Sequence, residues 1–241
     1  MKYGSSAFSM FLVGGYSLLA AKLKGVRHGK ESLTEQSDGL GDSTVSHTPI
    51  GMERATLVQT GAFFDDTVNG LHDAFKAAPT ASRVVTWGVE GNTIGLGFNG
   101  ALGAIGVKYE VLVAAGTGGL TKANATYQID GTIEEGVILQ AHQQQTIDWT
   151  NTSVDNAASS ANGGSGFLEV SQFAGLTGFI GIIEHSTDNS AWVTLITFAN
   201  VTAAPAAQRI TVAGTVNRYV RFRGDVTGTG TITAFAGFAR G

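Results

Sequence analysis

The residues of this sequence that could do acid–base or metal chemistry are its histidines and its two pairs of adjacent carboxylates. No two histidines are spaced like the ligands of a metal site, and no G-x-S-x-G motif supplies a catalytic serine. Asp65-Asp66 is explained by helix capping, and Glu134 and Glu135 point to opposite faces if they lie in a strand. We therefore expect no catalytic residues, no metal site and a protein that is not an enzyme. The histidines are His28, His47, His72, His142 and His185.

The segment from Gly95 to Gly100 matches the nucleotide-binding motif G-x-G-x-x-G. That motif binds phosphates where a helix opens at it, and the following residues, which include Gly103 and Gly106, are poor helix formers. The chain contains 34 glycines, so a chance match arises easily. The segment is better explained as a bend or a bulged hairpin, and we expect no cofactor.

A basic and aromatic run, NRYVRFR, occupies residues 217–223. In a strand, Arg221 and Arg223 share one face with Tyr219, and Arg218 lies on the other face. The net charge of −4 argues against a surface that binds nucleic acid. We therefore expect the three arginines to pair with carboxylates of a neighbouring subunit.

The composition favours a chain that buries part of its surface by self-association. Charged residues make up only 14% of the chain, below the roughly 25% typical of soluble domains, whereas apolar residues make up 43%. The sequence lacks cysteine, so disulfides are excluded. Residues 7–21 imitate a signal peptide but are interrupted by Gly14-Gly15, and no apolar run is long enough to span a membrane. We expect no membrane association.

The first part of the chain is expected to hold strands and one long loop. Residues 7–29 are typical of a strand pair or a bent strand. Residues 30–51 are polar and aperiodic, which predicts a loop. Loops of about 20 residues are uncommon in compact domains and usually serve a function, so this segment is a candidate assembly arm.

One helix is predicted, over residues 66–78. Asp65 or Asp66 can cap it, and Pro79 follows its end. Its apolar stripe, which would face the core, consists of Val68, Leu71, Phe75 and Ala78.

After the helix the pattern is entirely that of β-strands. Residues 150–166, TNTSVDNAASSANGGSG, are of low complexity and are interpreted as a linker or a long loop. This segment divides the chain into a first β domain, residues 1–149, and a C-terminal β-sandwich-like domain, residues 167–241.

The order of these segments resembles the major tail proteins, or tail tube proteins, of long-tailed, siphovirus-like bacteriophages. The resemblance is carried by short motifs that are spread over most of the chain. The motifs are Gly15-Tyr16-Ser17-Leu18, Glu35 to Asp42, Gly51-Met52-Glu53-Arg54-Ala55, Thr60 to Asp66, Asn69-Gly70-Leu71-His72, Glu184 to Asp188, Trp192 to Phe198, Thr215 to Arg221 and Gly237 to Arg240.

This resemblance implies a mainly β protein, with a tail-tube-type β-barrel or sandwich, one flanking helix and a C-terminal β-sandwich-like region. Six copies would join their sheets into a ring, because the two halves show no internal repeat that would favour three. Stacked rings would form the tube of a virion tail, assembled in the host cytoplasm. The expected partners are further copies, the tape measure, terminator and baseplate or tip proteins, and genomic DNA that passes through the lumen without specific binding.

The resemblance also gives roles to two groups of acidic residues. A mildly acidic lumen would repel phosphates and let DNA slide. The candidates for the lumen are Glu110, Asp130, Glu134 and Glu135. The candidates for contacts between rings, in the long loop, are Glu35, Asp38 and Asp42.

Two other functions stay open on the sequence. A secreted or surface β-sandwich module could bind carbohydrate, with Trp149, Trp192 or Tyr219 as the stacking platform. A capsid decoration protein would also be structural, but it would form trimers or shells. The state of assembly separates these alternatives from a tube protein.

Overall fold

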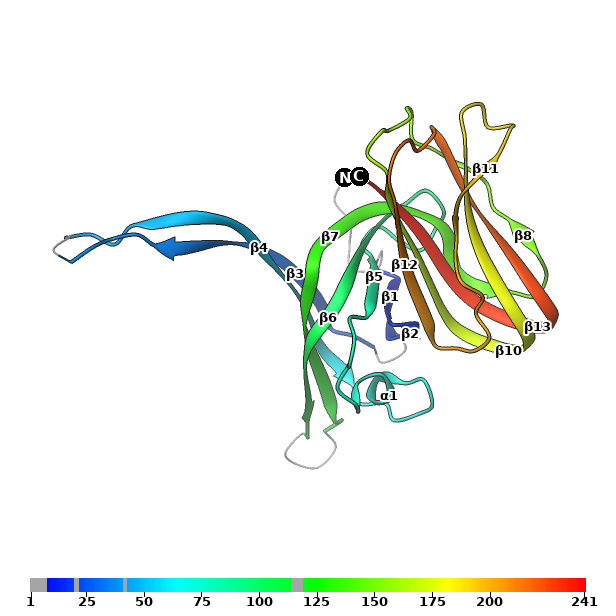
Figure 1. Ribbon diagram of the computed structural model, residues 1–241. Coiled ribbons are helices and arrows are strands. Elements are labelled where there is room, and N and C mark those ends of the chain that lie inside the picture. Colours follow the sequence, from blue (N-terminus) through cyan, green and yellow to red (C-terminus); the bar gives the residue numbers. More distant parts are fainter. Residues whose placement is uncertain (1–7, 20–21, 41–42, 114–118) are drawn as a thin grey trace.

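The computed structural model describes residues 8–19, 22–40, 43–113 and 119–241, and it is almost entirely β-structure (Figure 1). The described strands form one hydrogen-bonded, 13-stranded sheet, and the described residues contain a single short helix. This confirms the expected mainly β class. The elements are β1 (Met10–Val13), β2 (Tyr16–Ser17), β3 (Gly25–Gln36), β4 (His47–Phe63), α1 (Leu71–Phe75), β5 (Val84–Gly88), β6 (Gly97–Leu112), β7 (Lys122–Gln145), β8 (Trp149–Thr150), β9 (Val154–Asp155), β10 (Gly164–Ser186), β11 (Val193–Thr197), β12 (Ala206–Val212) and β13 (Tyr219–Arg240).

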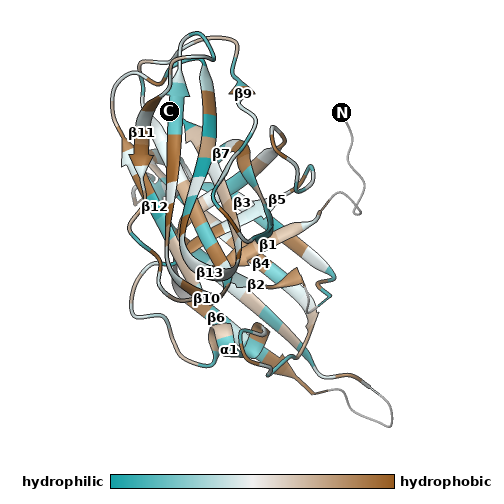
Figure 2. Cartoon of the chain, turned by 90° about the vertical axis from the view of Figure 1, so that its right-hand side faces the viewer, coloured by the Kyte–Doolittle hydropathy of each residue, from teal (hydrophilic) through white to brown (hydrophobic). Residues whose placement is uncertain are grey.

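The long strand β7 connects the two halves of the sheet. Its first part lies between β4 and β6, and its last part pairs with β13, which in turn pairs with β10 along almost its whole length. Hydrophobic and hydrophilic residues alternate along these strands, as expected for strands buried on one face (Figure 2). Strands on both sides of residue 150 therefore belong to one continuous ladder.

Residues 150–166, predicted as a linker or a long loop, have mostly irregular backbone that is hydrogen-bonded to the sheet at several points. They include β9 and the end of β8, and both strands pair with β13. The Asn151 N–H donates to the Phe222 carbonyl at 2.9 Å, and the Asn151 amide nitrogen donates to the Gln140 side chain at 2.6 Å. The Asn-rich composition hides this because its amides satisfy backbone groups of other strands rather than forming a periodic apolar pattern.

The segment predicted as a long loop, residues 30–51, is mostly a β-ribbon. β3 and β4 pair from Gly25 with Thr60 out to Gln36 with His47. The ribbon projects away from the rest of the molecule (Figure 1), and nearly all of its side chains are exposed. Neither face is buried, so the sequence shows no alternation of apolar and polar residues, and the prediction of a loop was wrong for this physical reason.

The helix is much shorter than predicted, since α1 spans Leu71–Phe75 rather than residues 66–78. Asn69 has a left-handed backbone with φ of +63°, which prevents an α-helix from continuing through it. Val68, expected on the apolar stripe, is 87% exposed. The Asp65 side chain instead accepts hydrogen bonds from the Thr67 N–H and hydroxyl, so it stabilises a turn ahead of the helix.

The N-terminal hairpin and the second half of the chain meet at the fully buried carboxyl group of Glu169, on β10. Its Oε2 accepts a 2.8 Å hydrogen bond from the Gly15 N–H, and its Oε1 lies 2.6 Å from the Thr86 hydroxyl. Gly15 has φ of +88°, and a Cβ there would lie 2.5 Å from the Ala206 nitrogen, so the β1–β2 turn packs directly on β12. Burial raises the pKa of Glu169 to about 8, which keeps the group neutral at lower pH.

The stability of the fold should fall as pH rises, because Glu169 holds its proton more tightly in the folded chain. Its pKa rises from 4.5 to about 8 on folding. Its contribution to the free energy of unfolding should therefore decrease by about 1 kcal/mol per pH unit between about pH 5 and pH 8. Glu169→Gln, which copies the neutral carboxyl, should lack this contribution in urea unfolding curves.

The comparison of wild type with Glu169→Gln isolates this effect from the histidines. Burial lowers the pKa of His142 and of His185, which acts on stability in the opposite direction with pH. If the variant and the wild type show the same slope, Glu169 is ionised in the folded chain and its burial does not control the pH dependence.

Candidate functional site

The feature that best suits an interface is a four-stranded part of the sheet, which we call the body sheet. It consists of residues 25–30 of β3, 55–63 of β4, 122–130 of β7 and 106–112 of β6. Arg27, Val58, Thr126 and Lys108 stand opposite one another in one row across its four strands. Side chains in such a row share a face of the sheet.

Both edges of the body sheet lack a partner strand among the described residues. On one side, β3 pairs with β4 alone. On the other side, β5 pairs with β6 as far as Leu102, and residues 106–112 of β6 pair with β7 alone. Since each neighbouring pair is antiparallel, the two edge strands β3 and β6 run in opposite directions. An edge strand exposes unpaired N–H and C=O groups that can bind another strand.

One face of the body sheet packs on the helix and the core. Tyr127 on β7 is fully buried against Phe75 of α1, at a ring-centroid distance of 5.7 Å. Its hydroxyl donates to Gln59 Oε1 at 2.9 Å, and burial raises its pKa well above the ordinary value. The opposite face carries Arg27, Lys108 and other polar side chains and is solvent-exposed. The body sheet is therefore held from one side and free on the other.

The four acidic residues predicted for a lumen do not gather on one face. Glu110 is exposed on β6 and forms an ion pair of 2.6 Å with Lys108. Asp130 is exposed and accepts a 2.9 Å hydrogen bond from the Ser82 hydroxyl.

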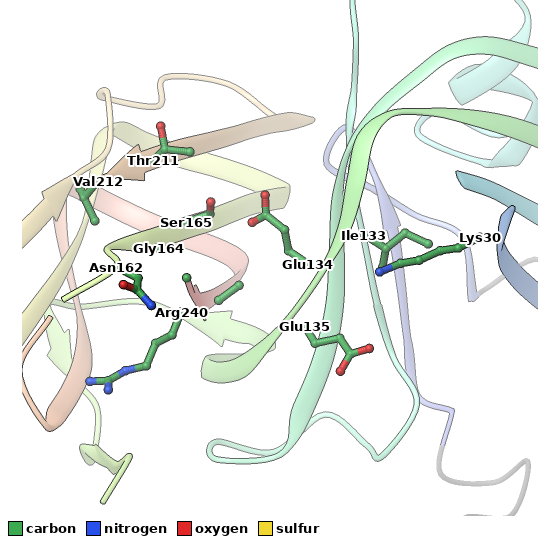
Figure 3. A pocket seen from close by; sticks show the side chains of 12 residues that line it. Lys30, Ile133, Glu134, Glu135, Asn162, Gly164, Ser165, Thr211, Val212 and Arg240 are labelled. Carbon is green, nitrogen blue, oxygen red and sulfur yellow. The ribbon is translucent and has the colours of Figure 1, made fainter. Parts of the chain in front are cut away.

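Glu134 and Glu135 point to opposite sides of β7, beside a hollow of about 560 Å³ (Figure 3). Glu134 is half-buried and pairs with Arg209 of β12, whereas Glu135 is exposed. These four residues therefore do not form one continuous acidic row, and their place in a lumen stays a prediction.

The exposed face of the body sheet instead carries basic side chains that the sequence analysis missed. Arg27 and Lys108 lie on the two edge strands, and Lys122 is exposed at the start of β7. They are far apart in the sequence, so only the strand register brings them to one face. No local motif could have identified them.

Two of the three acidic residues expected in the long loop, Glu35 and Asp38, lie on the ribbon or next to it. Glu35 is exposed near the end of β3. Asp38 accepts hydrogen bonds from the Gln36 amide at 2.9 Å and from the Ser46 N–H at 3.3 Å, and the Gln36 bond lowers its pKa. Asp42 lies outside the described residues.

The three arginines of the 217–223 run pair with carboxylates of their own chain, which corrects the expected pairing with a neighbouring subunit. Two hydrogen bonds of 2.7 Å join Arg218 to Asp155 and help lower the pKa of that carboxyl to about 2. Arg221 lies 2.8 Å from the buried Glu184. Arg223 lies 3.5 Å from Glu184 and 3.2 Å from Asp225. Strand pairing between β10 and β13 brings these partners together.

The aromatic rings considered as stacking platforms for carbohydrate already contact other side chains of the chain. The Trp149 ring stacks on Phe179, with centroids 5.5 Å apart. The Arg221 guanidinium lies 3.9 Å from the centre of the Trp192 ring, and that of Arg218 lies 4.9 Å from Tyr219. A sugar would have to displace these contacts or use the other ring faces.

One pair of side chains that could do chemistry lies outside the body sheet. His142 Nε2 and the Ser171 hydroxyl are 2.8 Å apart in a hollow of about 350 Å³. Burial lowers the pKa of His142, so the ring is neutral at neutral pH. Among the described residues, no carboxylate hydrogen-bonds this ring to orient it.

The described part of the chain has no group of three acidic or histidine side chains that could hold a metal ion. It also has no helix that is long and apolar enough to cross a membrane.

Alanine variants of Arg221 and Arg218 distinguish a role in the stability of the monomer from a role in contacts between subunits. Arg221→Ala should lower the free energy of unfolding of the monomer by about 2 kcal/mol, because it leaves the buried Glu184 with only the longer contact to Arg223. Arg218→Ala should cost less than about 1 kcal/mol, because the Arg218–Asp155 pair is exposed. Denaturant unfolding at low protein concentration measures the free energy of unfolding of both variants. If a variant loses assembly but keeps its monomer stability, the arginine acts between chains and not within one chain.

Comparisons with known proteins give no family for this chain. No protein-family model matches it, and neither does any curated protein. Among solved structures, it is similar to the crystal structure of the Dit protein (gp 19.1) of phage SPP1, described as a paradigm of the hub adsorption apparatus in phages that infect Gram-positive bacteria. The TM-score is 0.34 and the identity 13%, over 94% of this chain and 97% of that one. A likeness of this size establishes neither a family nor a function.

Proposed function

We propose that this chain is a structural, non-catalytic subunit of the tail tube of a long-tailed phage. Copies join edge to edge through the body sheet into rings, and the rings stack into a tube that conducts DNA. The tube would reside in the virion tail after assembly in the host cytoplasm. Its further partners would be the tape measure, tail-terminator and baseplate or tip proteins.

The proposal rests on the two open edges of the body sheet, β3 and residues 106–112 of β6, which run in opposite directions. When one copy is placed beside another by rotation about a ring axis, β6 of the first meets β3 of the second. These strands run in opposite directions, so the antiparallel ladder continues without interruption. A closed ring then satisfies the backbone groups of both edges, which a monomer leaves to water.

The geometry of strands sets the size of the ring. Strands lie about 4.8 Å apart and tilt by about 40° in closed barrels. Six copies would close roughly 24 strands into a barrel about 48 Å across, which leaves a lumen of about 38 Å once side chains are placed. Three copies would leave about 14 Å, which is too narrow for duplex DNA. Passage of DNA therefore favours six.

The exposed face of the body sheet would line this lumen. It carries Arg27, Lys108 and Lys122 together with Glu110, so the lining is mixed in charge rather than acidic. The ion pair between Lys108 and Glu110 partly neutralises it. The role as a conduit thus rests on the width of the lumen rather than on repulsion of phosphates.

Cysteine pairs across the two edges test ring formation directly, because the native chain has no cysteine. Arg27→Cys is combined in one chain with Lys108→Cys, Glu110→Cys or Leu112→Cys. The paired positions of one row are about 14 Å apart within a copy, too far for an intramolecular disulfide. Oxidation of at least one combination should give a ladder of cross-linked chains that ends at six.

A matched control combines Lys108→Cys with Thr229→Cys, an exposed position on β13 away from the body sheet. It should remain monomeric under the same oxidation. Electron microscopy of the uncrosslinked protein then separates rings and tubes from shells. Monomers in every edge combination would overturn the proposal and favour a binding module, and a trimer or shell would favour a decoration protein.

A further inference from the structure

The chain contains asparagine followed directly by glycine at Asn69, Asn99 and Asn162. In such a pair the glycine nitrogen can attack the carbonyl carbon of the asparagine side chain, because glycine has no side chain to hinder the approach. The reaction needs a free glycine N–H and an asparagine side chain that can turn toward it. The fold places these pairs in different surroundings and thereby decides which of them can react.

The first pair, Asn69–Gly70, is held by hydrogen bonds and packing. The Gly70 N–H donates to the Thr67 carbonyl at 2.8 Å, and the Asn69 N–H donates to the Asp73 carboxylate at 3.1 Å. Gly70 is buried, and a Cβ there would lie 2.9 Å from the Asp65 carboxyl carbon. The nitrogen that would attack is therefore occupied, and this turn must open before the pair can react.

The second pair, Asn99–Gly100, is held inside the sheet. Gly100 stands opposite Thr86 of β5 on one side and Glu134 of β7 on the other, so its N–H belongs to the strand ladder. Asn99 is only 7% exposed. A Cβ at Gly100 would lie 2.7 Å from the Phe167 ring, so the backbone is closely packed there as well.

The third pair, Asn162–Gly163, lies in a bend just before β10. The Asn162 side chain is exposed and lines the hollow of about 560 Å³ (Figure 3). The Asn162 N–H donates to the Ser160 hydroxyl at 3.2 Å. Within the part of the chain that the structure describes, no group accepts the Gly163 N–H, and none holds the Asn162 side-chain amide. Both groups that must react are thus free in the folded chain.

The backbone next to this bend is packed closely against the end of β13. The Gly163 carbonyl accepts a hydrogen bond of 3.1 Å from the Gly241 N–H. A Cβ at Gly164 would lie 2.3 Å from the Ala239 carbonyl oxygen, and one at Gly241 would lie 2.6 Å from the Asn162 carbonyl oxygen. The end of β13 therefore fits only the present length of the main chain at this bend.

We propose that Asn162 is a site of spontaneous deamidation in the folded chain, and that its isoaspartyl product loosens the end of β13 from the start of β10. The reaction takes place within one chain, so it is independent of the proposed assembly. It makes the bend a place where the protein changes slowly and irreversibly with age.

The reaction needs water as its only co-reactant. The Gly163 nitrogen loses its proton and bonds to the side-chain carbonyl carbon of Asn162. The bond from that carbon to the amide nitrogen breaks, and this nitrogen leaves with the proton as ammonia. Water then opens the resulting succinimide at either carbonyl group.

The two ways of opening the succinimide give two products. One is aspartate, which adds a negative charge to the hollow beside Glu134 and Glu135 and keeps the main chain as it was. The other is isoaspartate, in which the main chain passes through the side-chain methylene of residue 162 and becomes longer. Only isoaspartate disturbs the close packing of Gly163 and Gly164 against the end of β13.

Peptide mass spectrometry of the purified full chain, aged in buffer or in urea, tests the site. In urea the three asparagines should react at rates within a few-fold of one another, because each is followed by glycine. In the folded chain Asn162 should react about tenfold or more faster than Asn69 and Asn99, which must wait for local opening. Equal rates at the three sites of the folded chain would overturn the proposal, and so would an unreacted Asn162.

Asn162→Gln is the matched control, because it keeps the side-chain amide but its extra methylene makes ring closure slow. It should remove the reaction at this position and leave the rates at Asn69 and Asn99 unchanged. The rate at Asn162 should also rise with pH, because the Gly163 nitrogen must lose its proton to attack. A rate that does not change with pH would contradict attack by this nitrogen.

Hydrogen exchange at the amides of residues 239–241 tests the loosening. Protein aged until isoaspartate has accumulated should exchange several-fold faster there than fresh protein. Asn162→Asp adds the charge without lengthening the main chain, so it should exchange like fresh protein. Aged protein that also exchanges like fresh protein would overturn the loosening and leave the modification. Faster exchange in Asn162→Asp as well would assign the effect to charge and not to the longer main chain.

Discussion

The constraint on which the rest of this structure depends is that every strand of a sheet must find a partner for its backbone hydrogen bonds. The long strands β7, β10 and β13 meet it by pairing on both sides, and they hold the two halves of the chain in one ladder. β3 and the second half of β6 each have a partner on one side only among the described residues. These two edges lie at the two sides of one small sheet, so one further copy of the chain on each side could pair with them.

The interior packs against one face of the body sheet only. Tyr127 and Phe75 fix the sheet on the short helix, and the neutral carboxyl of Glu169 ties the β1–β2 turn to the second half of the chain. A buried carboxyl without a cationic partner is costly in its charged form, and hydrogen bonds from Gly15 and Thr86 orient it instead. The exposed face is then free to serve as a lining, because the core makes no demand on it.

The charges of the chain are used in two different ways. Around β10 and β13 the arginines and carboxylates neutralise each other within the molecule, so they offer little to a partner. On the ribbon of β3 and β4, by contrast, the acidic residues Glu31, Glu35 and Glu53 are exposed.

The sequence by itself determined that this protein is mainly β, with one helix between the first strands and the rest, and that it is poor in charge. Alternation of apolar and polar residues reports burial on one face, and Pro79 and the glycines limit the helix. Only the tertiary structure showed that β3 and β4 form a projecting ribbon, because a ribbon exposed on both faces has no alternation of apolar and polar residues in its sequence. The tertiary structure also decided which distant side chains share a face. The strand register placed Arg27 and Lys108 on the same face of the body sheet, and it gave Arg221 a carboxylate of its own chain. Local patterns contain no information on such long-range pairing, so the low charge could suggest self-association but could not identify the residues of the proposed interface.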